Sequence, residues 1–320
     1  MTNRCVYIAL MTDNNYVMPT EVLLKSMYEN KKQETIYKIF ILCDSLKNNN
    51  MVEKLREMTQ ENFYVETIKV DNPCKNFINN SNPLMTNTTF LKFEIASILK
   101  NYDKILYIDV DTIVLQDLLE LYNIDLKNTY AGVVKDYHVS YFYDSENFID
   151  INDYFNAGVL LLNTKKIREE NLNKLMADYY VKNNTKLMFH DQSVMNKIFN
   201  NNITIISPKY NWINSYTDYS DKKLELFFGI TNINSLKKDL CIIHYCKFKP
   251  WKYKNFKFSN LWLKYYLDLN YNIKNLNLKT CYLSSIYCLI RGRFKLRKLD
   301  DFIRKIRYYN YKKNNKITKL

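Results

Sequence analysis

The chain has 320 residues, 47% of them hydrophobic, which is enough for one large α/β domain or two smaller ones. Its N-terminus has only a short apolar run, and no stretch reaches the roughly 18 apolar residues that a membrane-spanning helix needs, so neither a secretory signal nor a transmembrane segment is expected. The seven cysteines form no C-x-x-C pair, which argues against a zinc ribbon and for reduced thiols in a cytoplasmic protein.

The net charge of +14 is concentrated near the C-terminus. Residues 279–320 hold 13 Lys and Arg against two Asp, whereas the first 278 residues carry 34 basic and 31 acidic residues. Such asymmetry predicts an anionic partner surface, either a membrane or a nucleic acid.

Apolar runs and helical periods alternate along the chain. Strands are expected at 5–10, 37–42, 63–70, 104–108, 155–163, near 203–206 and at 240–244. Helices are expected at 19–28, 46–59, 88–99, 165–181 and 191–200. This order predicts a mostly parallel sheet with helices on both faces. Beyond Trp251 the composition becomes aromatic and basic, so we place a domain boundary near residue 256, with domains at 1–255 and 256–320.

Two aspartates, Asp109 and Asp111, follow the buried strand at 104–108. Carboxylates at i and i+2 on an extended segment point to the same face and repel each other, and a divalent cation relieves that repulsion. The simple alternative is a solvated strand end, because Asp is common where strands stop. Ligands of α/β sheets bind at the carboxyl ends of such strands, which favours the cation.

The first strand is also followed by polar residues, Asp13, Asn15 and Tyr16. An Asp or Asn can read the edge of a uracil ring, and a tyrosine can stack on it. On these residues alone, an ordinary Asn/Asp turn is the better explanation.

Three further candidates lie in the second half of the chain. Asn156 and Ala157 precede Gly158, one of only four glycines, and a glycine within a strand often marks close approach of a ligand or a bulge. Asp191 and Gln192 lie at the predicted start of a helix, where Asp191 is either a capping residue or faces a substrate.

His244 ends the strand at 240–244, as the two aspartates end theirs. A lone histidine is more often structural than a ligand. An imidazole with two carboxylates suits Mn²⁺, or Mg²⁺, bound to a diphosphate, and Lys249 is placed to neutralise phosphate charge.

Together these segments resemble family 8 of the retaining glycosyltransferases, the family of glycogenin and of bacterial lipopolysaccharide galactosyl- and glucosyltransferases. The similarity runs in family order from residue 1 to about 255 and rests on LMTDNNY, TTFLKFEIASIL, DKILYIDVDTIVLQDL, YFNAGVLLLNTKKI, HDQSVMN and HYCKFKPW. It implies a GT-A fold, with a Rossmann-like central sheet, and a basic helical extension follows it in this chain.

The resemblance also implies roles for individual residues. Asp109, Asp111 and His244 are expected to bind Mn²⁺ across the diphosphate of a UDP-sugar. The residues expected to contact UDP and the donor sugar are Asp13, Asn15, Tyr16, Lys92, Asp109, Asp136, Asn156, Ala157 and Lys249. Asp191 and Gln192 are expected to be catalytic and to face the reacting sugar.

Two positions depart from the family pattern. The segment between His244 and Lys249 is shorter than usual and lacks a glycine, and Lys247 offers an additional cation. Lys92 stands where the relatives carry an arginine, so the planar, bidentate hydrogen-bond donor of the guanidinium group is lost.

The expected function is retaining transfer of galactose or glucose from a UDP-α-sugar to a lipopolysaccharide or another lipid-linked glycan. The alternatives are a self-glucosylating primer, an inactive sugar-binding module and a nucleic-acid-binding protein. The near-neutral body and the lack of a recognised RNA or DNA motif argue against the last.

The tail at 282–309 has an amphipathic helical period, with apolar Leu299, Phe302, Ile303 and Ile306 among many basic residues. A helix of this kind can lie on an anionic membrane, which predicts a peripheral protein on the inner face of the cytoplasmic membrane. The alternative is a helix packed on the domain, with its basic face in water.

Overall fold

The structure of the protein is a computed structural model. The structure describes residues 4–43, 49–70, 87–138, 154–183, 187, 189–200, 202–246 and 248–280. The amphipathic segment 282–309 and Lys247 therefore lie outside the described residues.

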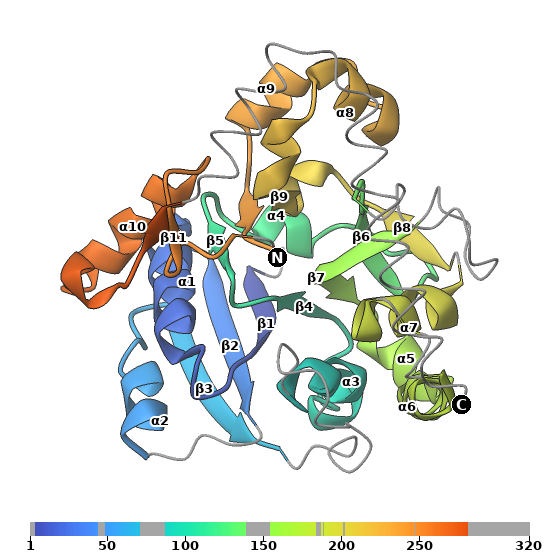
Figure 1. The fold of residues 1–320 in the computed structure, drawn as a ribbon. Coiled ribbons are helices and arrows are strands. Elements are labelled where there is room, and N and C mark those ends of the chain that lie inside the picture. The colour runs from blue at the N-terminus through green and yellow to red at the C-terminus, as the bar shows by residue number, and fades with distance from the viewer. Residues whose placement is uncertain are drawn as a thin grey trace, which may run out of the picture.

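A seven-stranded sheet forms the centre of the described chain (Figure 1). Its strands, in spatial order, are β3 (Phe63–Lys69), β2 (Ile36–Cys43), β1 (Cys5–Met11), β4 (Ile105–Ile108), β7 (Phe155–Leu162), β6 (Ala131–Lys135) and β8 (Ile203–Ile205). β7 runs antiparallel to both of its neighbours, and every other pairing is parallel. The expected mostly parallel sheet is thus confirmed, and the strand order reverses between β1 and β4.

Helices cover both faces of this sheet, because alternate residues of its strands enter two separate apolar clusters. One face is covered by α1 (Val17–Asn30), α2 (Asn49–Arg56) and α4 (Leu119–Tyr122). The other is covered by η2 (Asn87–Glu94), α3 (Ile95–Ile98), α5 (Thr164–Glu169), α6 (Leu172–Asn183) and α7 (His190–Phe199).

A second, small sheet carries the histidine candidate. It consists of β5 (Thr112–Val114), β10 (Ile242–His244) and β9 (Trp212–Ile213). Beside it lie η6 (Pro208–Tyr210), η7 (Asn214–Asp218), α8 (Asp221–Phe228) and α9 (Ile233–Lys238). The antiparallel pairing of β10 with β5 sets His244 opposite Thr112, next to Asp111. A third apolar cluster, including Trp212, Tyr216 and Trp262, fixes this sheet against α1.

The segment that follows packs on the outside of α1. It comprises β11 (Tyr253–Lys254), α10 (Ser259–Asp268), η8 (Ile273–Asn275) and β12 (Lys279–Thr280). Lys264 pairs with Glu29 at 2.8 Å, and the hydroxyl of Tyr265 accepts a hydrogen bond from Asn30 at 2.8 Å. Of the helices in the described part of the chain, none combines the length and the hydropathy needed to span a bilayer.

Two predicted helices are wrong in detail. The expected helix at 88–99 is mostly a 3₁₀ helix, and it buries three consecutive residues, Leu91, Lys92 and Phe93, rather than an α-helical stripe. The expected helix at 165–181 is divided into α5 and α6 at Asn171, whose φ of 52° is left-handed and ends the first helix.

Candidate active site

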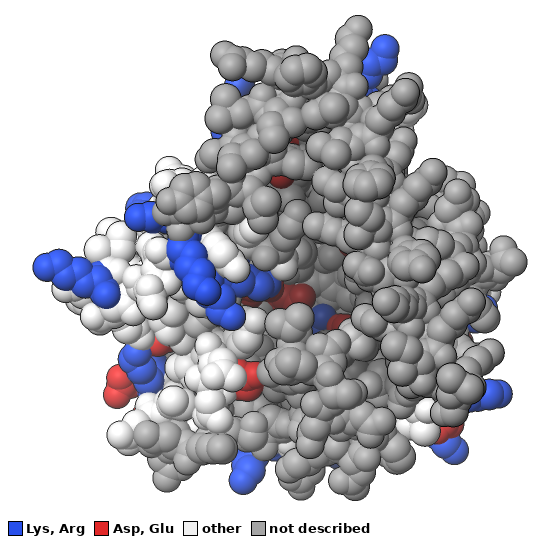
Figure 2. Space-filling view, viewed as in Figure 1, with Lys and Arg blue, Asp and Glu red and all other residues white. Residues whose placement is uncertain are grey.

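The polar residues that follow separate strands meet in one crevice. β1 and β4 are parallel neighbours where the strand order reverses, so the segments after Met11 and Ile108 leave the same edge of the sheet. Because β7 is antiparallel to β4, its N-terminal end lies at that edge too. Figure 2 shows acidic and basic side chains together at the bottom of a central hollow on this face. Sheet topology, rather than sequence proximity, therefore assembles the site.

Two carboxylates and an imidazole form a compact cluster at this edge. Nε2 of His244 lies 3.2 Å from Oδ1 of Asp111 and 3.8 Å from Oδ2 of Asp109, and one ligand atom from each residue lies within 4.8 Å of the others. This mixture of oxygen and nitrogen ligands fits Mn²⁺, and Mg²⁺ less well because of the imidazole. The residues expected to bind the metal are thus close enough to share one cation.

The cluster carries negative charge on its carboxylates and positive charge on the groups beside them. Burial disfavours the charged form of Asp111, but Lys249 and His244 outweigh burial and hold the pKa of this carboxyl group far below its usual range. Burial also opposes the charge on His244, yet Cys246 and Asp111 raise its pKa well above the ordinary value. A cation that binds the imidazole must therefore displace its proton.

Lys92 joins this cluster to the predicted catalytic residue. Its buried ammonium group lies 3.1 Å from Oδ1 of Asp109 and 2.8 Å from Oδ2 of Asp191. Burial opposes the charge, but the two carboxylates raise the pKa of Lys92 above its ordinary value. Asp191 lies in the first turn of α7, whose N-cap is Phe189, so the simple capping role considered for Asp191 is wrong.

An amide network connects α7 to β7. The Oε1 atom of Gln192 accepts hydrogen bonds from the backbone of Ala157 at 3.0 Å and from the amide of Asn156 at 3.2 Å. The amide groups of both Asn156 and Gln192 donate to Oδ2 of Asp136, at 3.2 and 3.3 Å. These four predicted site residues therefore form one hydrogen-bonded unit beside Asp191.

The residues predicted to bind uridine lie at the edge of the same crevice. Asp13 is buried, and its Oδ1 accepts the backbone N–H of Asn15 at 2.8 Å, so the simple Asp turn is present. The Tyr16 ring meets the ring of Trp251 edge-on, with centroids 5.8 Å apart. Burial raises the pKa of the Tyr16 hydroxyl. Lys249 lowers this pKa while Asp111 and Asp109 raise it, so the turn lies near the cluster. Lys249 itself forms an ion pair with Asp111.

Three residues of the site were missed by sequence reasoning. Asn211 is fully buried and contacts the ring of His244, Trp251 packs on Tyr16, and Tyr107 donates a hydrogen bond to Asp109. Tyr107 looked like a core residue of an apolar strand. Asn211 lies in an irregular segment with no periodic signal, so the printed sequence alone offers little to find it.

In a sheet of this topology ligands bind where the strand order reverses, and the candidate cation cluster lies at that point. Residues 7–255 match the profile of glycosyl transferase family 8, and the chain belongs to that family. Members are retaining, UDP-sugar-dependent glycosyltransferases that use a divalent metal. The enzyme class expected from the sequence is thus confirmed at the level of the family.

Named relatives agree with this assignment. A Haemophilus influenzae protein, named as a glycosyltransferase, is 31% identical over 194 residues, which are 60% of this chain and 53% of that protein. A lipopolysaccharide 1,2-glucosyltransferase of Escherichia coli is 26% identical over 249 residues, 75% of this chain and 71% of that enzyme. The chain thus spans about half the length of the Haemophilus influenzae relative.

The fold agrees as well. The structure of galactosyltransferase LgtC with donor and acceptor sugar analogues matches with a TM-score of 0.68 at 21% identity, covering 83% of this chain and 97% of LgtC. The expected GT-A architecture is therefore supported for the described residues. The roles given to individual residues stay predictions, as does the division at residue 256.

Proposed function

We propose that the chain is a retaining hexosyltransferase that moves galactose or glucose from a UDP-α-sugar to a glycan acceptor. One observation carries the proposal: a cation-binding cluster of Asp109, Asp111 and His244 is joined through the buried Lys92 to Asp191. A diphosphate bound at this cation would lie beside a sugar that faces Asp191, which supports the proposal.

When bound, Mn²⁺ or Mg²⁺ supplies charge neutralisation for the departing diphosphate. Lys249, which is paired with Asp111, adds a second positive charge beside the site of that diphosphate. Asp13 and Tyr16 border the crevice where the uridine is proposed to lie. Lys92 holds Asp191 toward the proposed sugar site, because its buried ammonium group lies 2.8 Å from Oδ2 of that carboxylate.

Retention of configuration is proposed to follow attack on the same face of the sugar. The Oε1 atom of Gln192 already accepts two hydrogen bonds, and an amide oxygen is a weak nucleophile, so a covalent intermediate on Gln192 is disfavoured. In the proposed step, the bond from the anomeric carbon to the UDP oxygen breaks and the bond to the acceptor oxygen forms. The acceptor's proton passes to the leaving phosphate oxygen.

The proposed acceptor is a lipid-linked surface glycan at the inner face of the cytoplasmic membrane. The Escherichia coli relative is a lipopolysaccharide glucosyltransferase, and the C-terminal 42 residues are strongly basic. The exposed lysines Lys252, Lys254, Lys257 and Lys279 extend this charge onto the described surface. Figure 2 shows basic side chains beside the central hollow. Co-sedimentation with anionic but not neutral vesicles is expected, and equal sedimentation with both would contradict membrane attachment.

A UDP-release screen tests the reaction itself. UDP-galactose, UDP-glucose and UDP-N-acetylhexosamines are each offered with Mn²⁺ or with EDTA. We expect metal-dependent UDP release from UDP-galactose or UDP-glucose. UDP binding without release from any donor, even with lipopolysaccharide acceptors, favours an inactive sugar-binding module. A mass increase of the protein itself by hexose units favours the self-glucosylating primer.

A further inference from the structure

His244 packs directly on the backbone of β7. A Cβ atom added at Gly158 would lie 2.1 Å from Cε1 and 2.6 Å from Nδ1 of the His244 ring, closer than any real contact. Glycine is therefore required at 158 by the imidazole and not by a turn. His244 is 3% exposed, so the orientation of its ring is set by the protein around it.

The hydrogen bonds near this ring determine which end of the Asn156 amide is the oxygen and which is the nitrogen. The backbone N–H of Gly158 can only donate, and it donates to Oδ1 of Asn156 at 2.9 Å. The other end of the same amide donates to the carboxylate of Asp136 at 3.2 Å, which gives the same orientation independently. The oxygen and nitrogen of Asn156 are thus assigned by two different partners.

The orientation of Asn156 in turn determines the orientation of the Asn211 amide, and Asn211 determines which nitrogen of His244 carries a proton. The Oδ1 atom of Asn156 also accepts a hydrogen bond from Nδ2 of Asn211 at 2.9 Å. The Oδ1 atom of Asn211 consequently faces Nδ1 of His244, at 3.0 Å. An amide oxygen has no proton to give, so Nδ1 of His244 must carry one.

We infer that Asn211 is a positioning residue that holds a proton on Nδ1 of His244 and leaves Nε2 directed at Asp109 and Asp111 as the metal ligand. This inference rests on the proposed function only for the identity of the ligand. Partners of this kind behind metal-binding histidines fix both the tautomer and the ring orientation. The chain of contacts runs from a backbone N–H, through two amides, to the cation site.

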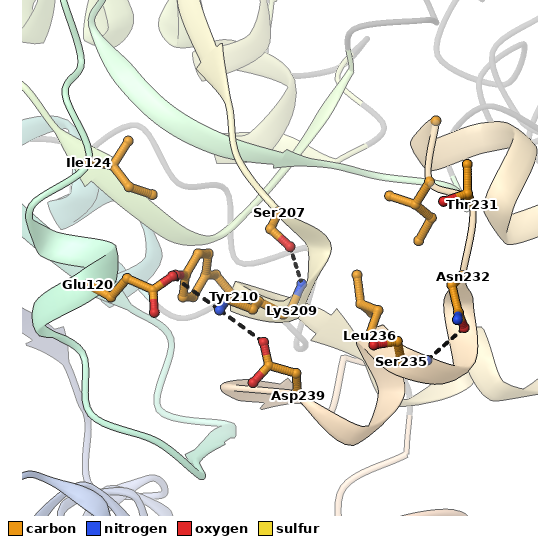
Figure 3. Close-up of a pocket in the computed structure, with 12 residues that line it drawn as sticks. Glu120, Ile124, Ser207, Lys209, Tyr210, Thr231, Asn232, Ser235, Leu236 and Asp239 are labelled. Atoms are coloured by element: carbon orange, nitrogen blue, oxygen red, sulfur yellow. Dashed lines mark hydrogen bonds and ion pairs between the residues drawn. The ribbon is translucent and has the colours of Figure 1, made fainter.

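Asn211 is itself held from the opposite side. It follows η6, where Lys209 pairs with Glu120 at 3.2 Å and with Asp239 at 3.0 Å, and the Tyr210 hydroxyl donates to Glu120 at 2.6 Å (Figure 3). These groups line a cavity of about 650 Å³, and because the charges compensate one another, the cavity offers little to select a charged ligand. The ion pairs and the hydrogen bond around it hold in place the segment that carries Asn211.

The tautomer can be observed directly, because the chain has only three histidines. Long-range ¹H–¹⁵N spectra of histidine-labelled protein, recorded without metal and with Zn²⁺ and UDP in place of paramagnetic Mn²⁺, assign the protons of each ring. We expect Nδ1 of His244 to be protonated in both conditions. A bare Nδ1 with the proton on Nε2 would overturn the inference, whether or not the protein binds metal.

Matched variants test the consequence for the metal. In Asn211→Ala, Mn²⁺ affinity measured by calorimetry at saturating UDP is expected to fall by about 10- to 100-fold. Asn211→Asp keeps an acceptor for the Nδ1 proton but loses the donor to Asn156, and it should retain more affinity than Asn211→Ala. Asn214→Ala is the control, since Asn214 is equally buried and its Oδ1 has no hydrogen-bond partner among the described residues.

The possible results distinguish a wrong inference about Asn211 from a wrong proposed function. If Asn211→Ala binds Mn²⁺ as tightly as Asn214→Ala does, the inference is wrong while the metal site stands. If wild-type protein binds no Mn²⁺ with UDP, the proposed function is wrong, and the nitrogen spectra still decide the tautomer. Circular dichroism of each variant checks that the protein is folded.

Discussion

Lys92 and Asp191 form a buried ion pair, with Nζ 2.8 Å from Oδ2. The same ammonium group contacts Asp109 at 3.1 Å and the backbone oxygen of Ala157 at 3.2 Å, so its three N–H donors match three protein acceptors. The sequence similarity predicted that Lys92 touches the donor sugar. That role stays a prediction, and the contacts show in addition that Lys92 holds two carboxylates in place.

Removing that lysine should destabilise the fold. Lys92→Met leaves Asp109 and Asp191 without their shared counterion, and loss of one member of a buried pair costs about 3–5 kcal/mol. Urea unfolding without metal measures this change. Lys165→Met, which breaks an exposed pair with Glu169, is the control and should cost about 1 kcal/mol or less. Equal losses in the two variants would show that the Lys92 contacts contribute little.

A side chain at Gly158 should damage the cation site. Gly158→Ala forces the His244 ring away from β7, because the added Cβ and the ring cannot occupy the same space. We expect Mn²⁺ affinity in the presence of UDP to fall at least about 10-fold. Gly132→Ala in β6 is the control, since its Cβ would meet the end of the Leu126 side chain at 3.1 Å and should affect stability alone. Unchanged Mn²⁺ affinity in Gly158→Ala would contradict the packing described here.

The sequence was most informative where chemistry follows a regular element. Asp109 and Asp111 were found because a run of apolar residues ends on them, and His244 because it ends another strand. The roles of Lys92 and Asn211 depend on partners that only folding brings near: Lys92 is joined to residues of β7 and α7, and Asn211 to Asn156 and His244. The 3₁₀ helix carrying Lys92 was missed for the same reason, because burial of Leu91, Lys92 and Phe93 together is a tertiary effect.

Asp191 should matter for transfer and not for nucleotide binding. Asp191→Asn removes the negative charge beside the sugar site but leaves Asp109, Asp111 and His244 intact. We expect the rate of UDP release to fall by at least about 100-fold, with the calorimetric UDP affinity in Mn²⁺ changed less than about threefold. Normal turnover would rule out the predicted catalytic role.

The stability of the protein should fall in mild acid because of His190. Burial lowers the pKa of His190 below its ordinary value of 6.5, although Asp191 opposes this, and its Nδ1 is buried without a hydrogen-bond partner in the described structure. The unfolded chain therefore takes up the proton first, so the contribution of neutral His190 is complete above about pH 6.5 and is lost as the pH falls through the folded pKa. Unfolding free energies from pH 7.5 to 5.5 should decline less steeply in His190→Gln. Identical slopes would show that His190 is not held neutral.

The dependence of UDP binding on metal tests the central claim most directly. Calorimetric titration of UDP into the wild-type protein should show binding with Mn²⁺ and little or none with EDTA, because the bound cation neutralises the charge of the diphosphate. Asp109→Asn should lose most of the Mn²⁺-dependent part. Equal UDP affinity in Mn²⁺ and in EDTA would contradict a cation held by Asp109, Asp111 and His244.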